Sequence, residues 1–207
     1  RLGREPAAFG LAERLSLAVI HEDDRIVRER GVIEVARSQV RPAALRRLAS
    51  AREALEIGSL LGYSTVQIAR VANHVVALDP HEGYPEDNPR PTLHAFMENL
   101  ELEAVRDKVT PIIGNDDMLM MMRSCWFGFC FIDATGRYKD TRRILERVIR
   151  VMNTHGTICV HDCGHPDWPG ALDAVNDFAV EHCVHFTMVD RMAIFKDIDC
   201  TRLPGGR

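Results

Sequence analysis

The chain has 207 residues and a net charge of −4, with 46% hydrophobic and 27% charged residues, a balance typical of one globular domain with a sizeable core. The slight negative charge gives no electrostatic reason to expect nucleic-acid binding, and no apolar run approaches the roughly 20 residues of a membrane span. The six cysteines are irregularly spaced, and the N-terminal residues lack the apolar core of a secretory signal. We therefore expect a cytoplasmic protein that binds neither nucleic acid nor membranes.

The first fifty residues show short helical patterns rather than strands. Residues 1–20 carry apolar side chains at helical spacing, and the charged stretch 21–30 predicts a solvated helix or loop. Two further short helices are predicted over 32–40 and 42–50, the second with Pro42 in its first turn. This segment precedes the patterns that carry chemistry.

A strand, a glycine-containing loop and a helix start follow one another within residues 54–70. Glu56 interrupts the short apolar run of the strand, and Ser64 and Thr65 stand where a helix N-cap is expected. A glycine lets the backbone come close to a ligand because it has no Cβ, and the helix N-terminus offers unpaired N–H groups to a polar or anionic group. The candidate ligand-binding residues of this stretch are Glu56, Gly58, Gly62 and Ser64.

The next apolar run, residues 75–78, ends at Asp79. In a nucleotide-binding βαβ unit, the acid that closes the second strand accepts hydrogen bonds from ribose hydroxyls. The spacing of the two glycines, Gly58-x-x-x-Gly62, differs from the dinucleotide fingerprint G-x-G-x-x-G. An ordinary β–α turn that needs glycine is the alternative that these residues leave open.

Five more strands and the helices between them are predicted downstream. Residues 80–91 form a loop, a helix runs from Thr92 to about residue 104, and the strand 109–113 leads to Asp116. The methionine-rich run 118–122 fills the core or lines a substrate pocket, and we favour the core. The later elements are a strand over 126–132 ending at Asp133, a helix over 141–152, a strand over 157–160 ending at His161 and Asp162, a helix over 169–181, and two strands within 184–196.

This alternation predicts an α/β three-layer sandwich with a Rossmann-like, mostly parallel seven-stranded sheet and an antiparallel closing hairpin. Because ligands bind at the carboxyl ends of parallel strands, we expect Asp79, Asp133 and Asp162 to converge on one crevice. Gathered carboxylates need a cation or ligand protons between them, and hard oxygen ligands suit Mg²⁺ or Ca²⁺. A zinc site built from His161, Cys163 and His165, completed by His182, Cys183 and His185, is a weaker alternative.

The pattern Glu56-x-Gly58-x-x-x-Gly62 followed by Asp79 resembles motif I of the class I S-adenosylmethionine-dependent methyltransferases, and the resemblance extends over residues 51–196. The endings at Asp133 and at His161-Asp162 resemble two groups of this family. One is the divalent-metal O-methyltransferases that act on catechol-like diols; the other is a broad bacterial group with a His-Asp pair after the fifth strand. Gly136 and Cys163 stand where the catechol type has a catalytic lysine and an asparagine ligand.

The resemblance implies particular roles for these residues. The cofactor S-adenosylmethionine is held by Glu56, Gly58, Gly62, Ser64, Asp79, Asp116 and Asp133, where Asp79 meets the ribose and Asp116 faces the adenine. For Asp116 a helix N-cap is an equally good interpretation. Asp133 and Asp162 are the candidate ligands of a metal such as Mg²⁺, and His161, with Asp133, is the candidate catalytic pair. His161 is either the general base or a residue that only orients Asp162.

We therefore expect an O-methyltransferase that acts on the hydroxyl of a small molecule. The alternatives are a metal-dependent hydroxylase-like enzyme and a non-catalytic nucleotide-binding module on the same fold. Residues 51–207 form the methyltransferase domain, and residues 1–50 form a helical cap over the cofactor or a homodimer interface, between which the sequence does not choose. The acceptor is not readable from these residues.

Overall fold

The structure is a computed structural model that describes residues 26–28, 31–33, 42–83 and 91–198. The chain divides into two compact units, residues 1–39 and residues 40–207. Within the described residues, no helix is long and apolar enough to cross a membrane.

In the first unit, strand β1 (Ile26–Arg28) pairs antiparallel with strand β2 (Gly31–Ile33), in a register that pairs Ile26 with Ile33 and Val27 with Val32. The predicted helix over 32–40 is therefore wrong at its first two residues, and the solvated helix or loop predicted over 21–30 is wrong at 26–28. The reason is that β-branched side chains lose rotamer freedom in a helix and favour strands. The predicted helix within residues 1–20 lies outside the described residues.

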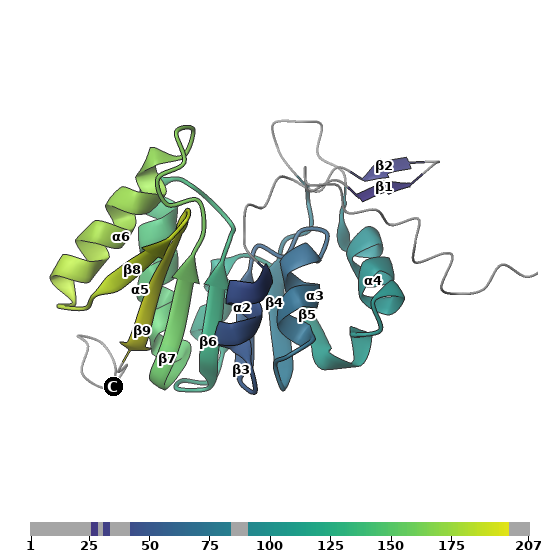
Figure 1. Cartoon of the computed structure of the whole chain (residues 1–207), viewed down its shortest axis with the longest axis horizontal. Helices are drawn as coiled ribbons and strands as arrows, with labels where there is room; N and C mark the ends of the chain where they lie inside the picture. Colours follow the sequence, from purple (N-terminus) through teal and green to yellow (C-terminus); the bar gives the residue numbers. More distant parts are fainter. Residues whose placement is uncertain (1–25, 29–30, 34–41, 84–90, 199–207) are drawn as a thin grey trace, which may run out of the picture. The chain divides into compact units, whose positions relative to one another are not determined.

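The second unit is built on a seven-stranded sheet with the order β5-β4-β3-β6-β7-β9-β8 (Figure 1). The five strands from β5 to β7 are parallel, and β9 lies antiparallel to both β7 and β8. The predicted fold, a mostly parallel sheet with an antiparallel closing hairpin, is confirmed. The strands are β3 (Glu53–Ile57), β4 (His74–Asp79), β5 (Val109–Ile113), β6 (Phe127–Ile132), β7 (Met152–Val160), β8 (Phe186–Val189) and β9 (Met192–Ile198).

Helices cover both faces of this sheet and make the three layers. One apolar cluster contains buried residues of α2, α3 and α4, and the other contains buried residues of α5, α6 and the 3-10 helix η2. The helices are α2 (Pro42–Ala49), α3 (Tyr63–Ala69), α4 (Leu93–Leu102), η1 (Arg106–Lys108), η2 (Asp116–Met121), α5 (Tyr138–Val151) and α6 (Pro169–Glu181). Helix α2 belongs to the predicted N-terminal segment, yet its Leu45 and Ala49 are fully buried in the same cluster as α3 and α4.

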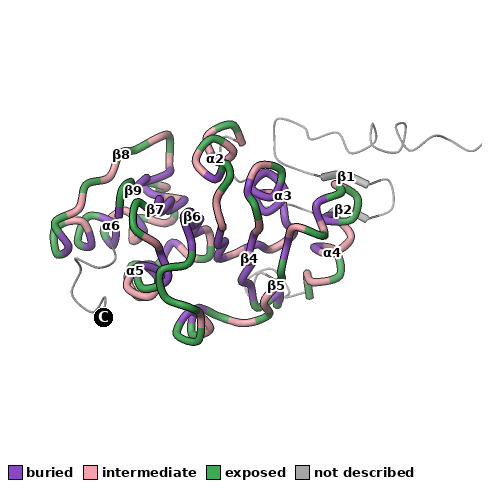
Figure 2. The backbone as a smooth tube through the Cα atoms, turned by 90° about the horizontal axis from the view of Figure 1, so that it is seen from below, coloured by how far each residue is buried: buried purple, intermediate pink, exposed green. Residues whose placement is uncertain are grey.

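Strand β6 is the centre of the core, and all six of its residues are buried (Figure 2). Phe129 and Phe131 belong to the cluster on one face, whereas Cys130 and Ile132 belong to the cluster on the other. Because both faces are covered, the sequence of the strand is continuously apolar instead of alternating.

The methionine-rich run 118–122 comprises the last four residues of η2 and Met122, which follows η2. Met118 and Met122 pack against the core, in agreement with the favoured interpretation, whereas Met121 is 82% exposed. Strand β7 begins at Met152, immediately after α5 and five residues before the predicted start. Neither difference changes the order of the strands, which alone decides which strand ends lie side by side.

Candidate active site

The residues predicted to carry chemistry lie at the carboxyl ends of four neighbouring parallel strands. In the sheet these strands are adjacent in the order β4, β3, β6 and β7. Strand β4 ends at Asp79, and the residues that directly follow β3, β6 and β7 are Gly58, Asp133 and His161. Backbone hydrogen bonds tie the ends together: Gly58 N–H donates to the carbonyl of Leu78, and Asp133 N–H donates to that of Ile57. Parallel pairing therefore brings these residues to one edge of the sheet.

The glycine turn between β3 and α3 has a different local structure from the one predicted. Gly62 occupies the N-cap position with φ 88° and ψ 13°, no side chain caps the helix, and the helix begins at Tyr63. The expectation that Ser64 and Thr65 form the N-cap is therefore wrong, because the left-handed glycine starts the helix before them. Both are buried inside α3, where the Thr65 hydroxyl donates a hydrogen bond to Glu56 Oε2.

The space beside the two glycines is taken by protein atoms. A Cβ on Gly58 would lie 2.4 Å from the carbonyl oxygen of Asp133, and a Cβ on Gly62 would lie 3.0 Å from the ring of Phe96. Both glycines have positive φ, 92° and 88°, which other residues adopt at a cost. The sequence rule that these glycines leave room for a ligand is thus incomplete, because Gly58 lets the ends of β3 and β6 pack backbone against backbone and Gly62 makes room for the ring of Phe96.

Asp79 is buried, and each oxygen of its carboxylate accepts a backbone hydrogen bond. Leu60 N–H in the glycine turn donates to Oδ2 at 2.8 Å, and His81 N–H donates to Oδ1 at 2.6 Å. The orientation of the carboxylate is therefore fixed by its own loop and by the glycine turn. His81 lies in the loop after β4, yet it is only 3% exposed.

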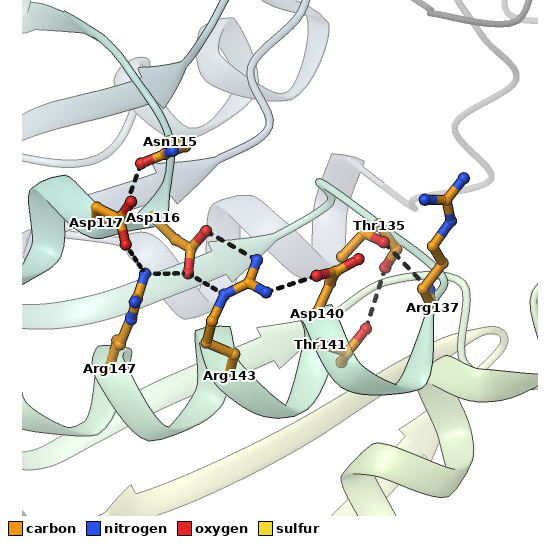
Figure 3. Close-up of polar contacts among 9 residues, drawn as sticks. All are labelled: Asn115, Asp116, Asp117, Thr135, Arg137, Asp140, Thr141, Arg143 and Arg147. Carbon is orange, nitrogen blue, oxygen red and sulfur yellow. Dashed lines mark hydrogen bonds and ion pairs between the residues drawn. The ribbon is translucent and has the colours of Figure 1, made fainter.

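Asp116 binds arginines of α5 (Figure 3). Its carboxylate accepts from Arg143 Nε at 2.9 Å and from Arg147 Nη1 at 2.6 Å. Burial alone would raise the pKa of Asp116, but the hydrogen bonds and charges of the two arginines lower it below its ordinary value. The N-cap interpretation for Asp116 is wrong because Asn115 holds that position and accepts from Asp117 N–H. Contact with an adenine stays a prediction.

Helix α5 also holds the loop that follows Asp133. The Thr141 hydroxyl donates to the carbonyl of Thr135 at 3.2 Å, and the Thr135 hydroxyl accepts from Arg137 N–H at 3.1 Å (Figure 3). One helix thus fixes two of the loops at the carboxyl edge, the loop after β5 and the loop after β6.

Asp133, His161 and Asp162 form a cluster in which the ligand-type atoms lie within 4.8 Å of one another. His161 Nδ1 is 3.1 Å from Asp133 Oδ1 and 3.3 Å from Asp162 Oδ1. Burial lowers the pKa of His161, but the hydrogen bonds and charges of the two carboxylates outweigh burial and raise the pKa to about 10. The protonated ring then donates to both acids, which favours the alternative that His161 orients Asp162; its role as a general base stays a prediction.

Glu56 is fully buried beneath the glycine turn. Its pKa is raised to about 8, mainly by burial and in part by the negative charges of Asp133 and Asp79, while hydrogen bonds from Ser64 and Thr65 oppose the rise. Its Oε1 atom is buried and has no hydrogen-bond partner in the protein, and the same holds for Ser59 Oγ and His161 Nε2. Buried polar atoms are normally paired, so these three atoms fit a polar ligand, and the excess of acidic groups fits a ligand that carries positive charge.

The structure explains both departures from the catechol-type pattern. A Cβ on Gly136 would lie 2.3 Å from Cβ of Trp168 and 2.6 Å from its Cγ, so the indole occupies the place where a lysine side chain would start. Cys163 is 1% exposed, and its thiol donates to the carbonyl of Val160 within the core. Burial raises the pKa of this thiol to about 12, and the thiol belongs to neither of the two groups of metal-type ligands among the described residues.

The zinc alternative is not formed by the residues that the structure describes. The two described groups of metal-type ligands are Asp133 with His161 and Asp162, and Glu146 with Glu181 and His182, and neither contains a cysteine. In the second group Arg142 pairs with both glutamates, so a cation is already present. An apolar cavity of about 310 Å³ lies away from the carboxyl edge, lined by Glu53, His74, Val76, Ile112, Met122, Arg123, Trp126 and Phe127.

Comparisons with known proteins agree with this arrangement. A family model described as a methyltransferase domain matches residues 55–163, which include the glycine turn, Asp79 and the Asp133–Asp162 cluster. The solved structure of cofactor-bound Rv0187 from MTB is 25% identical, with a TM-score of 0.63 and coverage of 91% of this chain and 89% of that chain. The comparison with curated proteins found no match.

Two further solved structures share the fold at lower identity. An O-methyltransferase from Bacillus cereus in complex with SAH is 20% identical, with a TM-score of 0.59 and coverage of 91% of this chain and 89% of that chain. The O-methyltransferase TomG from Streptomyces achromogenes, involved in tomaymycin synthesis and solved with SAM, is 18% identical, with a TM-score of 0.58 and coverage of 81% and 82%.

The packing of Gly58 against Asp133 predicts a large effect of Gly58→Ala. Gly164 is the matched control, since it has a similar φ of 82° but its added Cβ would meet nothing closer than 3.9 Å. Gly164→Ala should cost only the left-handed strain of about 1–2 kcal/mol, whereas Gly58→Ala should cost at least about 1 kcal/mol more because of overpacking. Urea unfolding measures both variants, and equal losses would contradict the packing argument.

The raised pKa of Glu56 predicts a pH-dependent stability. Because the folded pKa of about 8 exceeds the ordinary glutamate value of 4.5, Glu56 stabilises the fold below pH 4.5, and this stability is lost as pH rises toward 8 at up to about 1.4 kcal/mol per pH unit. Glu56→Gln removes this titration. The difference in unfolding free energy between Glu56→Gln and the wild type should therefore shift in favour of the variant between pH 5 and pH 8, and a constant difference would show that Glu56 is ionised throughout.

Proposed function

Since the chain belongs to the family of methyltransferase domains, we propose that it transfers a methyl group from S-adenosylmethionine to the hydroxyl oxygen of a small molecule, with a divalent cation such as Mg²⁺ beside the acceptor. The observation that carries the proposal is the joint placement of the glycine turn, Asp79 and the Asp133–His161–Asp162 cluster at one edge of the sheet. Two neighbours described as O-methyltransferases, one solved with SAM and one with SAH, support the donor and the oxygen acceptor.

The chain's own residues divide into donor-side and acceptor-side groups. On the donor side, Asp79 presents a carboxylate of fixed orientation to the ribose hydroxyls, and Glu56 offers an unpartnered buried oxygen to the positively charged end of the donor. When bound, S-adenosylmethionine supplies an electrophilic methyl group on a sulfonium. The contribution of the protein is to hold the donor and acceptor in line and to exclude water between them.

On the acceptor side, Asp133 and Asp162 would hold the cation, and a cation held there lowers the pKa of a bound hydroxyl. Their side chains are 22% and 30% exposed, whereas the side chain of His161 between them is 3% exposed. Two partly open carboxylates around a buried ring leave oxygen atoms free for a ligand, as Mg²⁺ sites completed by water and substrate require. His161 keeps both carboxylates in place.

The hydroxylase-like alternative finds less support in the cluster. Non-haem iron oxygenases typically use two histidines and one carboxylate, whereas this cluster has one histidine and two carboxylates. A non-catalytic binding module would bind the donor without turnover. A small-molecule acceptor, a cytoplasmic location and homodimerisation remain predictions of the sequence.

The function is tested by calorimetric titration of the protein with S-adenosylmethionine, S-adenosylhomocysteine and NAD, followed by product analysis with a panel of hydroxylated aromatic and sugar acceptors. We expect micromolar binding of the two adenosyl ligands, no binding of NAD, and methylated product that falls in the presence of EDTA. Binding of NAD alone would overturn the proposal, and binding of the donor without turnover on any acceptor would favour the binding module.

The acceptor-side assignment predicts that Asp133→Asn and Asp162→Asn weaken Mn²⁺ binding by about tenfold or more, as loss of one charged oxygen ligand does. Asp167→Asn is the control, because Asp167 lies in the same loop as Asp162 with an 82% exposed side chain. Electron paramagnetic resonance of free Mn²⁺ measures the affinities. Equal affinities for all three variants and the wild type would contradict the assignment.

A further inference from the structure

His81 has a strained backbone that serves a contact with Asp79. It lies two residues after Asp79 with φ 55°, in the left-handed region that few residues other than glycine adopt, although asparagine, aspartate and histidine are found there more often than the rest. In this conformation its N–H turns back to Asp79 Oδ1 at 2.6 Å. Local strain persists only where the surroundings over-determine it, so the side chain of His81 should show what holds it.

The ring of His81 is fixed from two sides. Nδ1 lies 3.0 Å from the hydroxyl of Thr92, and Thr92 N–H in turn donates to the carbonyl of His81 at 3.0 Å. These two contacts join the beginning and the end of the connection between β4 and α4. On its other side the ring packs on Phe96 with 4.9 Å between ring centroids.

Phe96 links His81 to the glycine turn. The same phenyl ring lies where a Cβ on Gly62 would approach to 3.0 Å, and the turn that Gly62 closes carries Leu60, whose N–H donates to Asp79 Oδ2 at 2.8 Å. The two backbone donors of the Asp79 carboxylate are thus connected through the packing of His81 on Phe96. Moving the ring of His81 would loosen the loop that carries one of these donors, the N–H of His81, and would remove the packing of that loop against the glycine turn.

The contribution of His81 is geometric and not one of charge. Burial is the largest effect on its pKa and lowers it, although the charge of Asp79 opposes this in part. A neutral ring forms no ion pair with Asp79, so it leaves the charge of the carboxylate available to a ligand.

We propose that His81 is a cofactor-positioning residue, which holds the Asp79 carboxylate toward the ribose hydroxyls of the bound donor by fixing the loop after β4 against the glycine turn. The inference rests on the proposed function, because it takes an adenosyl ligand as the partner of Asp79. It adds a residue outside the motif that the sequence identified.

The test is calorimetric titration of His81→Ala with S-adenosylhomocysteine. Loss of the ring should free the strained backbone and turn one donor away from Asp79, which should weaken binding by about tenfold or more, as the loss of a buried hydrogen bond to a charged group does. His81→Asn should retain affinity within about threefold, since asparagine tolerates positive φ and can bond locally. Thr92→Val, which removes only the hydroxyl, should weaken binding by about threefold.

His182→Ala is the matched control. His182 is 8% exposed, its ring packs on Phe178 with 4.4 Å between centroids, and its Nε2 lies 3.0 Å from Glu146 Oε1. It thus repeats the contacts of His81 between α5 and α6, where no candidate cofactor residue lies. The melting temperature of His182→Ala should fall by about as much as that of His81→Ala, but its affinity for S-adenosylhomocysteine should stay within twofold of the wild-type value.

Unchanged affinity in His81→Ala would overturn the inference, and so would an equal loss in His182→Ala, because the effect would then be one of general stability. If His81→Ala does not fold, unchanged affinity in Thr92→Val overturns the inference and the threefold loss supports it. Absence of binding in the wild type would instead overturn the proposed function, which separates the two failures.

Discussion

The site depends on the close approach of two backbone segments, the end of β3 at Gly58 and the end of β6 at Asp133. No side chain fits between them, since a Cβ on Gly58 would lie 2.4 Å from the carbonyl oxygen of Asp133. The hydrogen bond from Asp133 N–H to the carbonyl of Ile57 holds the two segments together. This contact brings the glycine turn and its acid, Asp79, alongside the acids that end β6 and β7. A larger distance between Gly58 and Asp133 would separate the glycine turn and Asp79 from the acids that follow β6 and β7.

The same contact concentrates negative charge, and the protein manages that charge in two ways. Glu56 is held at a raised pKa by burial and by the neighbouring carboxylates, and His161 carries a proton between Asp133 and Asp162. Both arrangements are those of a site prepared for a positively charged ligand, because a cation would relieve the repulsion that the protons now relieve. On the opposite flank, Arg143 and Arg147 neutralise Asp116 and fix its loop to α5. Asp116 is therefore paired with arginines, whereas Asp79, Asp133 and Asp162 lie beside histidines.

Much of this could be predicted from the sequence because strand ends and apolar runs are local signals. The run Phe127–Ile132 indicated a strand covered on both faces, and the residue after each run indicated which side chains share an edge. The N-cap of α3, the partners of Asp116 and the burial of His81 could not be predicted, because they depend on contacts across the fold: the positive φ of Gly62, the arginines of α5 and the ring of Phe96. Likewise, the sequence shows only that a glycine stands where the catechol type has a lysine; the structure shows that Trp168 fills the space where that side chain would begin.

The central claim is that one edge of the sheet gathers an adenosyl site and a cation site around the Gly58–Asp133 contact. A crystal structure with S-adenosylhomocysteine and Mn²⁺, in which the anomalous signal locates the metal, tests it most directly. We expect the anomalous peak between the carboxylates of Asp133 and Asp162, and the ribose hydroxyls against Asp79. A peak at Glu146 and Glu181, or adenosyl density away from the glycine turn, would contradict the account.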